Sequence, residues 1–353
     1  MGVLGVGIIG FGRIGVEHAN WINASQSARL LAVDDVTPAR RALADRHRVH
    51  VYGDIEALLA DPAVEAVLVS TPTAMHFEHA SRALAAGKHV MVEKPIALDL
   101  PQARALVEDA ERRGLVLSVF HNRRWDLDYL TVRAAIESGA FGKVINVESR
   151  LGQFASCVGP AAREYHPNWR NESAFGGGGL YDWGSHFVDQ LWRLMLPAKP
   201  VRVYAQLRGN VWSSDCDDFA RVLIDFDDGG GALGRGAVGL VEINTTTSRP
   251  LPRWHVDGTA GSAFSPYSPD FDTSVWASLR FTPAKQGEPS RTFPPAARGL
   301  SETQMWEYFA AAVRGEGEPA VTARSVLPTM ALLDAARESS RSGCAVDVRR
   351  VAD

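Results

Sequence analysis

Residues 3–15 read VLGVGIIGFGRIG, an apolar run that leads directly into the pattern Gly10-x-Gly12-x-x-Gly15. Residues 16–24 can continue as a helix, so the pattern lies in the strand–turn–helix context of a dinucleotide-binding fingerprint. There Gly10 permits the tight turn, Gly12 lets the backbone approach a pyrophosphate, and Gly15 lets the helix sit close to the strand. We therefore expect a dinucleotide to bind along the whole loop, at Gly10, Phe11, Gly12, Arg13, Ile14 and Gly15.

A pair of aspartates follows the next apolar run. Residues 30–33 (LLAV) predict a second strand, and Asp35 comes about 20 residues after Gly15, where the fingerprint places an acid. Such an acid accepts hydrogen bonds from ribose hydroxyls and repels a 2′-phosphate, so we expect NAD as the cofactor, with NADP as the alternative. Asp34 and Asp35 could instead simply begin the loop before Thr37.

Strand and helix patterns alternate up to residue 122. Apolar runs at 66–70, 89–92 and 115–120 predict strands, and residues 76–86 and 101–113 predict helices. This alternation is typical of a doubly wound parallel sheet, the Rossmann fold, in which ligands bind beyond the carboxyl ends of the strands. Polar motifs follow those ends, and they supply the remaining cofactor-binding candidates: Thr71, Pro72, His76, Glu93, Lys94 and Asn122.

The pattern changes after residue 122. A helical segment at 127–138 precedes alternating stretches suited to an open, mostly antiparallel sheet, and two helical segments close the chain. The glycine-dense stretch 229–239 predicts a hairpin tip, and the proline-rich stretch 284–298 predicts a surface loop. We expect two domains: a dinucleotide-binding domain over 1–122, and an α+β domain over 123–353 for substrate binding and oligomerisation. The exposed sheet face predicts a homodimer or homotetramer.

Bulk composition narrows the class of protein. The chain has 353 residues and a formal net charge of -4, which gives no electrostatic reason to expect nucleic acid or a membrane as a partner. No run is apolar enough to span a bilayer and no basic segment precedes the first strand, so we expect a cytoplasmic protein. The 3 cysteines lack disulfide or zinc spacing, and no ligand cluster predicts a metal.

A second informative stretch is residues 176–189, GGGGLYDWGSHFVD. If the part after the glycines is helical, Asp182 and His186 lie one turn apart on one face. An apolar stripe follows another face: Leu180, Trp183, Phe187, Leu191 and Leu194. The polar pair should therefore face away from the core. A carboxylate beside an imidazole orients the ring and provides proton transfer near neutral pH, although such a pair can also be structural.

Together these motifs resemble the Gfo/Idh/MocA oxidoreductases over nearly the whole chain. The shared features are the glycine fingerprint, the acid after the second strand, Thr71-Pro72, Glu93-Lys94-Pro95, Trp169-Arg170 and Gly-Gly-x-x-x-Asp182-x-Gly184-x-His186. A narrower likeness, in residues 119–126, is to the branch that contains NADP-dependent scyllo-inositol dehydrogenases. The resemblance implies an NAD(P)-dependent dehydrogenase that transfers hydride between a secondary alcohol of a cyclic polyol or sugar, such as an inositol or aldose, and nicotinamide.

The resemblance also implies roles for individual residues. His186 would accept the hydroxyl proton, because the ordinary pKa of histidine, about 6.5, lies near the working pH. Lys94 would donate hydrogen bonds to the same oxygen, Asp182 would hold a neighbouring hydroxyl or orient the imidazole, and Glu93 would contact the nicotinamide ribose. The expected substrate-binding residues are Lys94, Arg123, Trp169, Arg170, Asp182 and His186. This set implies an active site between the two domains, with the glycine run close to the nicotinamide.

These assignments have structural alternatives. Lys94 could be a solvated lysine paired with Glu93, and His18 and His76 could be packing residues. Two other functions also fit the fold. One is a redox-neutral, glycoside-cleaving enzyme that uses bound NAD transiently. The other is a non-catalytic nucleotide or sugar sensor, which would tend to lack the lysine or the histidine that this chain has.

Overall fold

A computed structural model describes residues 2–157, 168–209, 211–228, 233–268 and 271–349. The chain divides into two compact units. The first unit contains the residues up to Asn122 together with two later segments, 168–177 and Leu300–Leu327. The second unit contains the rest. Two segments beyond residue 122 therefore belong with the N-terminal unit, whereas the sequence patterns suggest a single boundary there.

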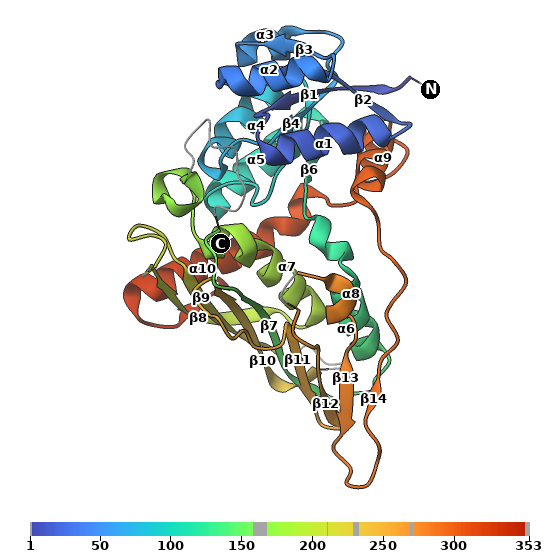
Figure 1. Cartoon of the computed structure of the whole chain (residues 1–353), viewed down its shortest axis with the longest axis vertical. Helices are drawn as coiled ribbons and strands as arrows, with labels where there is room; N and C mark the ends of the chain where they lie inside the picture. The colour runs from blue at the N-terminus through green and yellow to red at the C-terminus, as the bar shows by residue number, and fades with distance from the viewer. Residues whose placement is uncertain (1, 158–167, 210, 229–232, 269–270, 350–353) are drawn as a thin grey trace. The chain divides into compact units, whose positions relative to one another are not determined.

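The first unit is built on a 6-stranded parallel sheet in the order β3-β2-β1-β4-β5-β6 (Figure 1). Its strands are β1 (Leu4–Ile9), β2 (Ala28–Asp34), β3 (His50–Tyr52), β4 (Ala66–Val69), β5 (His89–Val92) and β6 (Leu117–Val119). β1 and β4 are buried along their whole length, as strands covered on both faces must be. The strand order reverses between β1 and β4, at the switch point where doubly wound sheets bind ligands. The predicted Rossmann sheet is confirmed.

Helices surround this sheet, and capping residues explain several of their ends. The α-helices are α1 (Arg13–Ala24), α2 (Pro38–Arg46), α3 (Ile55–Ala60), α4 (His76–Ala85), α5 (Leu100–Arg113) and α9 (Glu302–Val313). The short 3-10 turns are η1 (Thr73–Met75), η3 (Trp169–Asn171), η4 (Ser173–Phe175) and η6 (Ala323–Val326). Ser301 and Gln304 form a capping box at the start of α9. This helix packs on α1 and so brings the late part of the chain into the nucleotide-binding unit.

The second unit contains a 9-stranded sheet in the order β14-β13-β12-β11-β7-β10-β9-β8-β15. Its strands are β7 (Val144–Gly152), β8 (Pro200–Arg208), β9 (Phe219–Phe226), β10 (Leu233–Asn244), β11 (Trp254–Gly258), β12 (Gly261–Phe264), β13 (Arg280–Pro283), β14 (Arg291–Thr292) and β15 (Val346–Asp347). All neighbours are antiparallel except β7 and β10. The mostly antiparallel sheet is confirmed.

Two local predictions in this unit need correction. The consecutive strands β9 and β10 pair antiparallel, as the predicted hairpin requires, but β10 begins at Leu233, inside the stretch predicted as the tip, because Leu233 pairs with Val144 of β7 before regular pairing resumes at Val238. Residues 229–232 of that stretch lie outside the described residues. β14 lies inside the stretch predicted as a loop, because a two-residue strand at the edge of a sheet leaves too short a pattern to detect.

The helices of the second unit cover one face of its sheet. They are α6 (Leu127–Glu137), α7 (Ser185–Leu194), α8 (Thr273–Trp276) and α10 (Leu327–Ser342), with the 3-10 turn η2 (Asn122–Trp125) and the π-helical turn η5 (Leu180–Gly184). β9 alternates accordingly between buried residues such as Val222 and exposed ones. On the uncovered face, Tyr204 and Leu223 lie opposite each other and remain 37% and 42% exposed.

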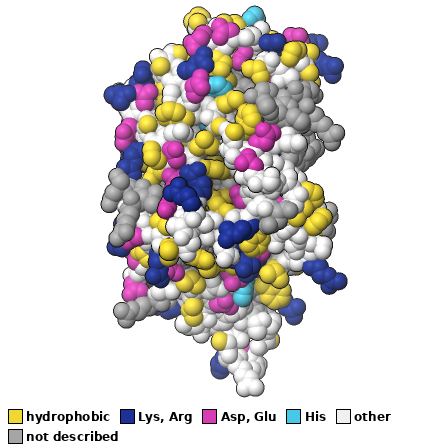
Figure 2. Space-filling model, turned by 90° about the vertical axis from the view of Figure 1, so that its left-hand side faces the viewer, with side chains coloured by type: hydrophobic (Ala, Val, Ile, Leu, Met, Phe, Trp, Pro, Cys, Tyr) yellow, Lys and Arg dark blue, Asp and Glu magenta, His cyan; other side chains and the backbone are white. Residues whose placement is uncertain are grey.

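The charged surface is mixed. Basic and acidic side chains are interspersed over the face shown in Figure 2. Among the described residues, no helix combines the length and apolarity that a membrane crossing needs.

Candidate active site

A cavity of about 250 Å³ lies in the first unit, at the carboxyl ends of β1, β2 and β4. Its position is the one that the topology of the sheet predicts for a nucleotide. Seven of the cofactor-binding candidates line it: Gly10, Gly12, Arg13, Ile14, Asp35, Thr71 and Pro72. Arg40 of α2 also lines it and was not among the candidates, although its place one turn into the helix after the acidic pair is a usable signal.

The three fingerprint glycines are required for different reasons. Gly10 has φ +91°, and a Cβ there would lie 2.8 Å from Thr71 Cγ2. A Cβ on Gly15 would lie 2.5 Å from the carbonyl oxygen of Gly10, so this glycine brings α1 close to the turn. A Cβ on Gly12 would meet no atom within 4 Å. Only Gly12 therefore borders open space, at the N-terminus of α1 where unsatisfied amide groups can bind phosphate.

Two carboxylates form the end of the cavity beyond β2. Asp35 accepts hydrogen bonds from the amide of Phe11 (2.6 Å) and from the amide of Thr37 (2.8 Å), so it also ties the glycine loop to this end. Asp34 is 4% exposed. Burial, together with the charges of Asp35 and Asp54, raises the pKa of Asp34 to about 6. The acidic end suits ribose hydroxyls and disfavours a further phosphate.

The turn after β4 forms the opposite wall. Ser70 Oγ donates to the carbonyl oxygen of Gly10 (2.7 Å). His76 is buried behind this wall, where its ring nitrogens lie 2.8 Å from the carbonyl oxygen of Pro95 and 2.9 Å from that of Thr71. Burial lowers the pKa of His76, although the two carbonyl groups act in the opposite direction. The structure thus places this histidine in the packing and not in the lining.

Trp169 and Arg170 lie in η3 and line the same cavity. The guanidinium carbon of Arg170 lies 4.3 Å from the centroid of the Trp169 ring. From the sequence, this pair is expected to bind the substrate. In the structure it lies at the wall of the nucleotide cavity, because residues 168–177 belong to the first unit.

Other cofactor candidates lie outside the lining. Phe11 is fully buried, with its ring edge-on to His47. Asn122 donates to Glu302 Oε1 (3.3 Å). Glu93 and Lys94 follow β5, where Glu93 is buried and Lys94 is half-buried. The Lys94–Pro95 peptide is cis.

In the second unit, the chain enters α7 through the π-helical turn η5. Asp182 lies in this turn and is half-buried, whereas His186 lies in the first turn of α7 and is only 5% exposed. The expectation that both side chains face away from the core is therefore wrong for His186. The segment after the glycines is helical, but its first turn is π-helical, and turns of this kind occur often at functional sites.

The glycine run divides between the two units. A Cβ on Gly176 would lie 2.6 Å from Leu98 Cδ2, and one on Gly177 would lie 2.5 Å from the carbonyl oxygen of Arg170. A Cβ on Gly178 would lie 2.3 Å from Asp217 Oδ1. These glycines are needed because the chain passes close to other protein atoms, whereas the sequence predicts only that they lie close to the nicotinamide.

Asp217 fixes the start of η5. Its Oδ2 accepts from the amide of Leu180 (2.7 Å) and its carbonyl oxygen accepts from the amide of Gly179 (2.8 Å). Burial raises the pKa of Asp217 to about 6, with the hydrogen bond from Leu180 acting in the opposite direction. Asp217 is not among the residues predicted from the sequence, because no spacing connects residue 217 with the glycine run.

Charged and polar contacts anchor α7 one turn after His186. Asp189 accepts a bidentate pair of hydrogen bonds from Arg124 (2.7 and 2.8 Å) and a third from Thr329 (2.8 Å). Gln190 accepts from the buried Arg253 (2.7 Å). Both residues lie three or four positions after His186, on the same face of the helix, so these contacts hold α7 firmly next to the histidine.

Arg123 lies beside the same helix. Its guanidinium carbon lies 4.7 Å from the ring centroid of Trp183 and 4.4 Å from that of Phe271. Its Nη1 pairs with Asp126 (3.0 Å). The two rings pack on each other with centroids 4.6 Å apart, so the side chain lies against both of them next to Asp182 of η5.

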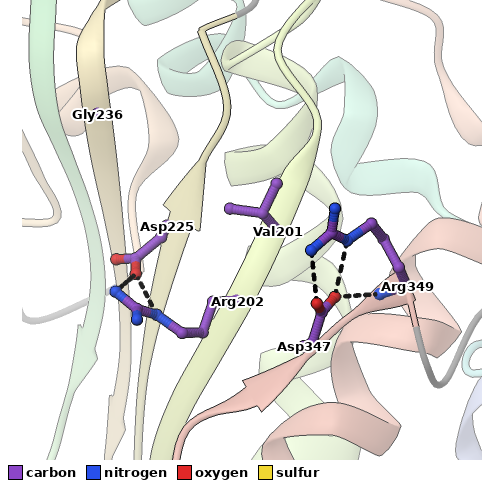
Figure 3. A pocket seen from close by; sticks show the side chains of 6 residues that line it. All are labelled: Val201, Arg202, Asp225, Gly236, Asp347 and Arg349. Atoms are coloured by element: carbon purple, nitrogen blue, oxygen red, sulfur yellow. Dashed lines mark hydrogen bonds and ion pairs between the residues drawn. The ribbon is translucent and has the colours of Figure 1, made fainter.

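The charged side chains around a second hollow in this unit are already paired with each other. The hollow is lined by Val201, Arg202, Asp225, Gly236, Asp347 and Arg349 (Figure 3). Arg202 pairs with Asp225 and Arg349 pairs with Asp347, each at 2.6 Å, so both guanidinium groups are already neutralised. In the described part of the chain, no group of His, Cys, Asp and Glu has the arrangement of a metal site.

Comparisons with known proteins extend these observations. Residues 4–121 match an oxidoreductase family model with an NAD-binding Rossmann fold, and residues 129–264 match the GFO/IDH/MocA C-terminal domain. An uncharacterised oxidoreductase of Escherichia coli is 37% identical over 60% of this chain and 59% of its own length. An NADP-dependent scyllo-inositol 2-dehydrogenase of Bacillus subtilis is 30% identical over 63% of this chain and 59% of its own.

A solved NAD-binding protein from Listeria innocua is 28% identical and has a TM-score of 0.85, over 98% of this chain and 97% of that one. The matched stretch spans less than two thirds of the length of either curated relative. The two domain models, by contrast, match both the Rossmann half and the sheet that follows it. The chain therefore belongs to the Gfo/Idh/MocA oxidoreductase family and carries that family's NAD-binding Rossmann domain.

Proposed function

We propose that this protein is an NAD-dependent dehydrogenase that oxidises a secondary alcohol of a cyclic polyol or sugar. The observation that supports it most is the cavity of the first unit, where the open space beside Gly12 and the acidic end at Asp34 and Asp35 suit a dinucleotide with free ribose hydroxyls. Trp169 and Arg170 contact the same cofactor in this proposal, since they line the same cavity.

The reaction requires a proton acceptor and a donor to the substrate oxygen. NAD, when bound, supplies the hydride acceptor. His186 takes the hydroxyl proton, and Lys94 donates a hydrogen bond to the same oxygen, which stabilises its developing negative charge. Asp182 binds a neighbouring hydroxyl or orients His186. The carbon loses its hydride and becomes a carbonyl, so that protons and electrons balance.

The proposed substrate class draws on a relative and on the aromatic residues near Asp182. The similar B. subtilis protein is named for scyllo-inositol, which is a cyclic polyol. Trp183 and Phe271 pack on each other and form an aromatic surface that can stack on the carbon skeleton of such a polyol, while Arg123, which lies against both rings, provides N–H donors for its hydroxyls.

The proposed cofactor preference differs from that of the same relative, whose name specifies NADP. Asp35 faces the cavity that would hold the adenosine ribose, and Asp34 lies beside it. A 2′-phosphate would lie close to these acidic groups and would be repelled. We therefore propose NAD as the preferred cofactor.

We further propose that the protein forms a homodimer or homotetramer through the uncovered face of the second sheet. Tyr204 and Leu223 place apolar surface on this face over β8 and β9, with the Arg221–Glu242 ion pair nearby. A large sheet face that carries apolar side chains is stabilised when a second copy covers it.

A substrate screen tests the proposed function. Inositols and aldoses are incubated with NAD and with NADP in parallel, and reduced nicotinamide is followed by its absorbance. We expect turnover of at least one cyclic polyol with NAD, and a loss of about 100-fold in Lys94→Met and His186→Gln. Lys285→Met is the matched control, because Lys285 is an exposed lysine in another part of the chain.

Two outcomes would contradict the proposal and identify its competitors. NAD binding without turnover of any polyol or sugar would favour a sensor. Cleavage of a glycoside with tightly bound NAD and no net reduced nicotinamide would favour the redox-neutral reaction.

A further inference from the structure

A chain of buried hydrogen bonds runs from α9 to the backbone of Lys94. The indole N–H of Trp306 donates to His18 Nδ1 (3.1 Å), and His18 Nε2 lies 2.9 Å from Glu93 Oε1. The other carboxylate oxygen, Oε2, accepts from the amide of Lys94 (3.1 Å). All four residues belong to the first unit. The chain thus connects a helix near the C-terminus with the lysine proposed to bind the substrate oxygen.

The indole N–H of Trp306 determines where the protons lie in this series of hydrogen bonds. An indole N–H can only donate, so His18 Nδ1 must accept and its single proton must lie on Nε2. That proton is donated to Glu93, which is therefore the acceptor and a carboxylate. Burial alone would raise the pKa of Glu93, but the hydrogen bond from His18 and the charge of Lys94 outweigh it and lower the pKa.

The surroundings of the imidazole are rigid. His18 is fully buried, with the ring centroids of Phe120 and Trp21 at 4.2 and 4.9 Å. Trp306 is also fully buried. On the other side of the turn, His76 lies 2.8 Å from the carbonyl oxygen of Pro95. The Lys94–Pro95 segment is therefore held at the Lys94 amide by Glu93, and its Pro95 carbonyl packs against the buried ring of His76.

We propose that His18 and Trp306 are positioning residues for Lys94, acting through Glu93. This inference rests on the proposed function, in which Lys94 contacts the substrate oxygen. Both carboxylate oxygens of Glu93 then accept hydrogen bonds from within the protein, and the role of Glu93 is to orient Lys94. The late segment Leu300–Leu327 becomes part of the catalytic unit, since Trp306 determines the tautomer of His18.

The kinetic test separates positioning from packing. Trp306→Phe keeps an aromatic ring but removes the donor, and His18→Leu removes both ring nitrogens. We expect each variant to lower kcat by about 10-fold, with KM and the Kd for NAD changed by less than about 2-fold, because displaced supporting groups weaken the reacting geometry more than the binding. His18→Gln should restore most of the lost kcat, because its amide can still donate to Glu93.

Trp254→Phe is the matched control. Trp254 is also fully buried, and its indole donates to Asp128 (2.6 Å) in the second unit. This variant should lose stability comparably and keep kcat within about 2-fold. Equal kcat losses in Trp306→Phe and Trp254→Phe, or wild-type kcat in His18→Leu, would overturn the proposal.

Two measurements on the wild type and the variants need no turnover. Nitrogen-15 NMR of the histidine rings should show His18 with its proton on Nε2, and a proton on Nδ1 would contradict the chain of donors. Trace acetylation with acetic anhydride should change the reactivity of Lys94 in Trp306→Phe by at least about 2-fold, with that of the exposed Lys285 unchanged. Unchanged Lys94 reactivity would refute the positioning role. Normal turnover in Lys94→Met would instead refute the proposed function, while the NMR and labelling results would still decide the hydrogen-bond chain.

Discussion

Replacement of Gly12 by alanine should separate nucleotide binding from folding. The residue is the N-cap of α1, with φ -68° and ψ -165°, a conformation that alanine adopts without strain. An added Cβ would meet no atom within 4 Å. Gly15 is the matched comparison, because a Cβ there would lie 2.5 Å from the carbonyl oxygen of Gly10.

The structure predicts different effects for the two variants. At Gly12, a strain-free Gly→Ala change restricts the unfolded chain, but alanine is a poorer N-cap than glycine, so the two effects oppose each other and the free energy of unfolding of the apoprotein should change by less than about 1 kcal/mol. The methyl group would occupy space that the pyrophosphate needs, so we expect NAD to bind at least about 10-fold more weakly, which corresponds to about 1.4 kcal/mol. Gly15→Ala should destabilise the apoprotein by about 1–3 kcal/mol, since the backbone must shift.

Urea unfolding of the apoprotein and calorimetric titration with NAD measure the two effects separately. Wild-type NAD affinity in Gly12→Ala would refute the assignment of the cavity to the dinucleotide. A Gly12→Ala apoprotein destabilised as much as Gly15→Ala would refute the inference that Gly12 borders open space.

Three further predictions concern stability and assembly. Asp34→Asn should stabilise the protein by about 1 kcal/mol at pH 7 and by much less near pH 4. The pKa of Asp34 is raised to about 6, so the stability of the wild-type protein falls as the pH rises from about 4 to about 6. Equal effects in urea unfolding at both pH values would contradict this. Asp217→Ala should cost about 1–3 kcal/mol in the same measurement and lower kcat, because it removes the acceptor of the Leu180 amide; an unchanged midpoint would argue against its role at η5. Leu223→Arg should reduce the sedimenting mass of the oligomer, and an unchanged mass would exclude this face as the interface.

The periodic parts of the fold could be predicted from the sequence. β1 is a continuous apolar run that ends in three spaced glycines, and β9 alternates between buried and exposed residues, so each reports its own environment. Contacts between residues that are far apart in the sequence leave no such periodic pattern. Ser118 Oγ donates to the carbonyl oxygen of Val321 (2.7 Å), and this contact helps to join the late segment to the first unit although the two residues lie far apart in sequence.

In the candidate site, too, residues in local motifs could be predicted from the sequence, whereas those that depend on distant contacts could not. Gly10, Gly12 and Asp35 could be found because the dinucleotide fingerprint depends on local spacing. Trp169 could be predicted from the sequence as a site residue. The cavity that it lines could not be predicted, because this depends on residues 168–177 folding back onto the first unit. His18 could be seen only as a histidine on a helix, since its role depends on Trp306 and Glu93, which are distant in sequence.

The most direct test of the central claim is deuterium transfer from the substrate to the cofactor. A cyclic polyol that the screen identifies is labelled with deuterium at the oxidised carbon, and the reduced nicotinamide is examined by NMR and mass spectrometry. The proposed reaction predicts one deuterium in each molecule of reduced nicotinamide that accumulates, with transfer at least about 100-fold slower in His186→Gln. Reduced nicotinamide without deuterium, or deuterium exchange without accumulation of reduced nicotinamide, would contradict a dehydrogenase.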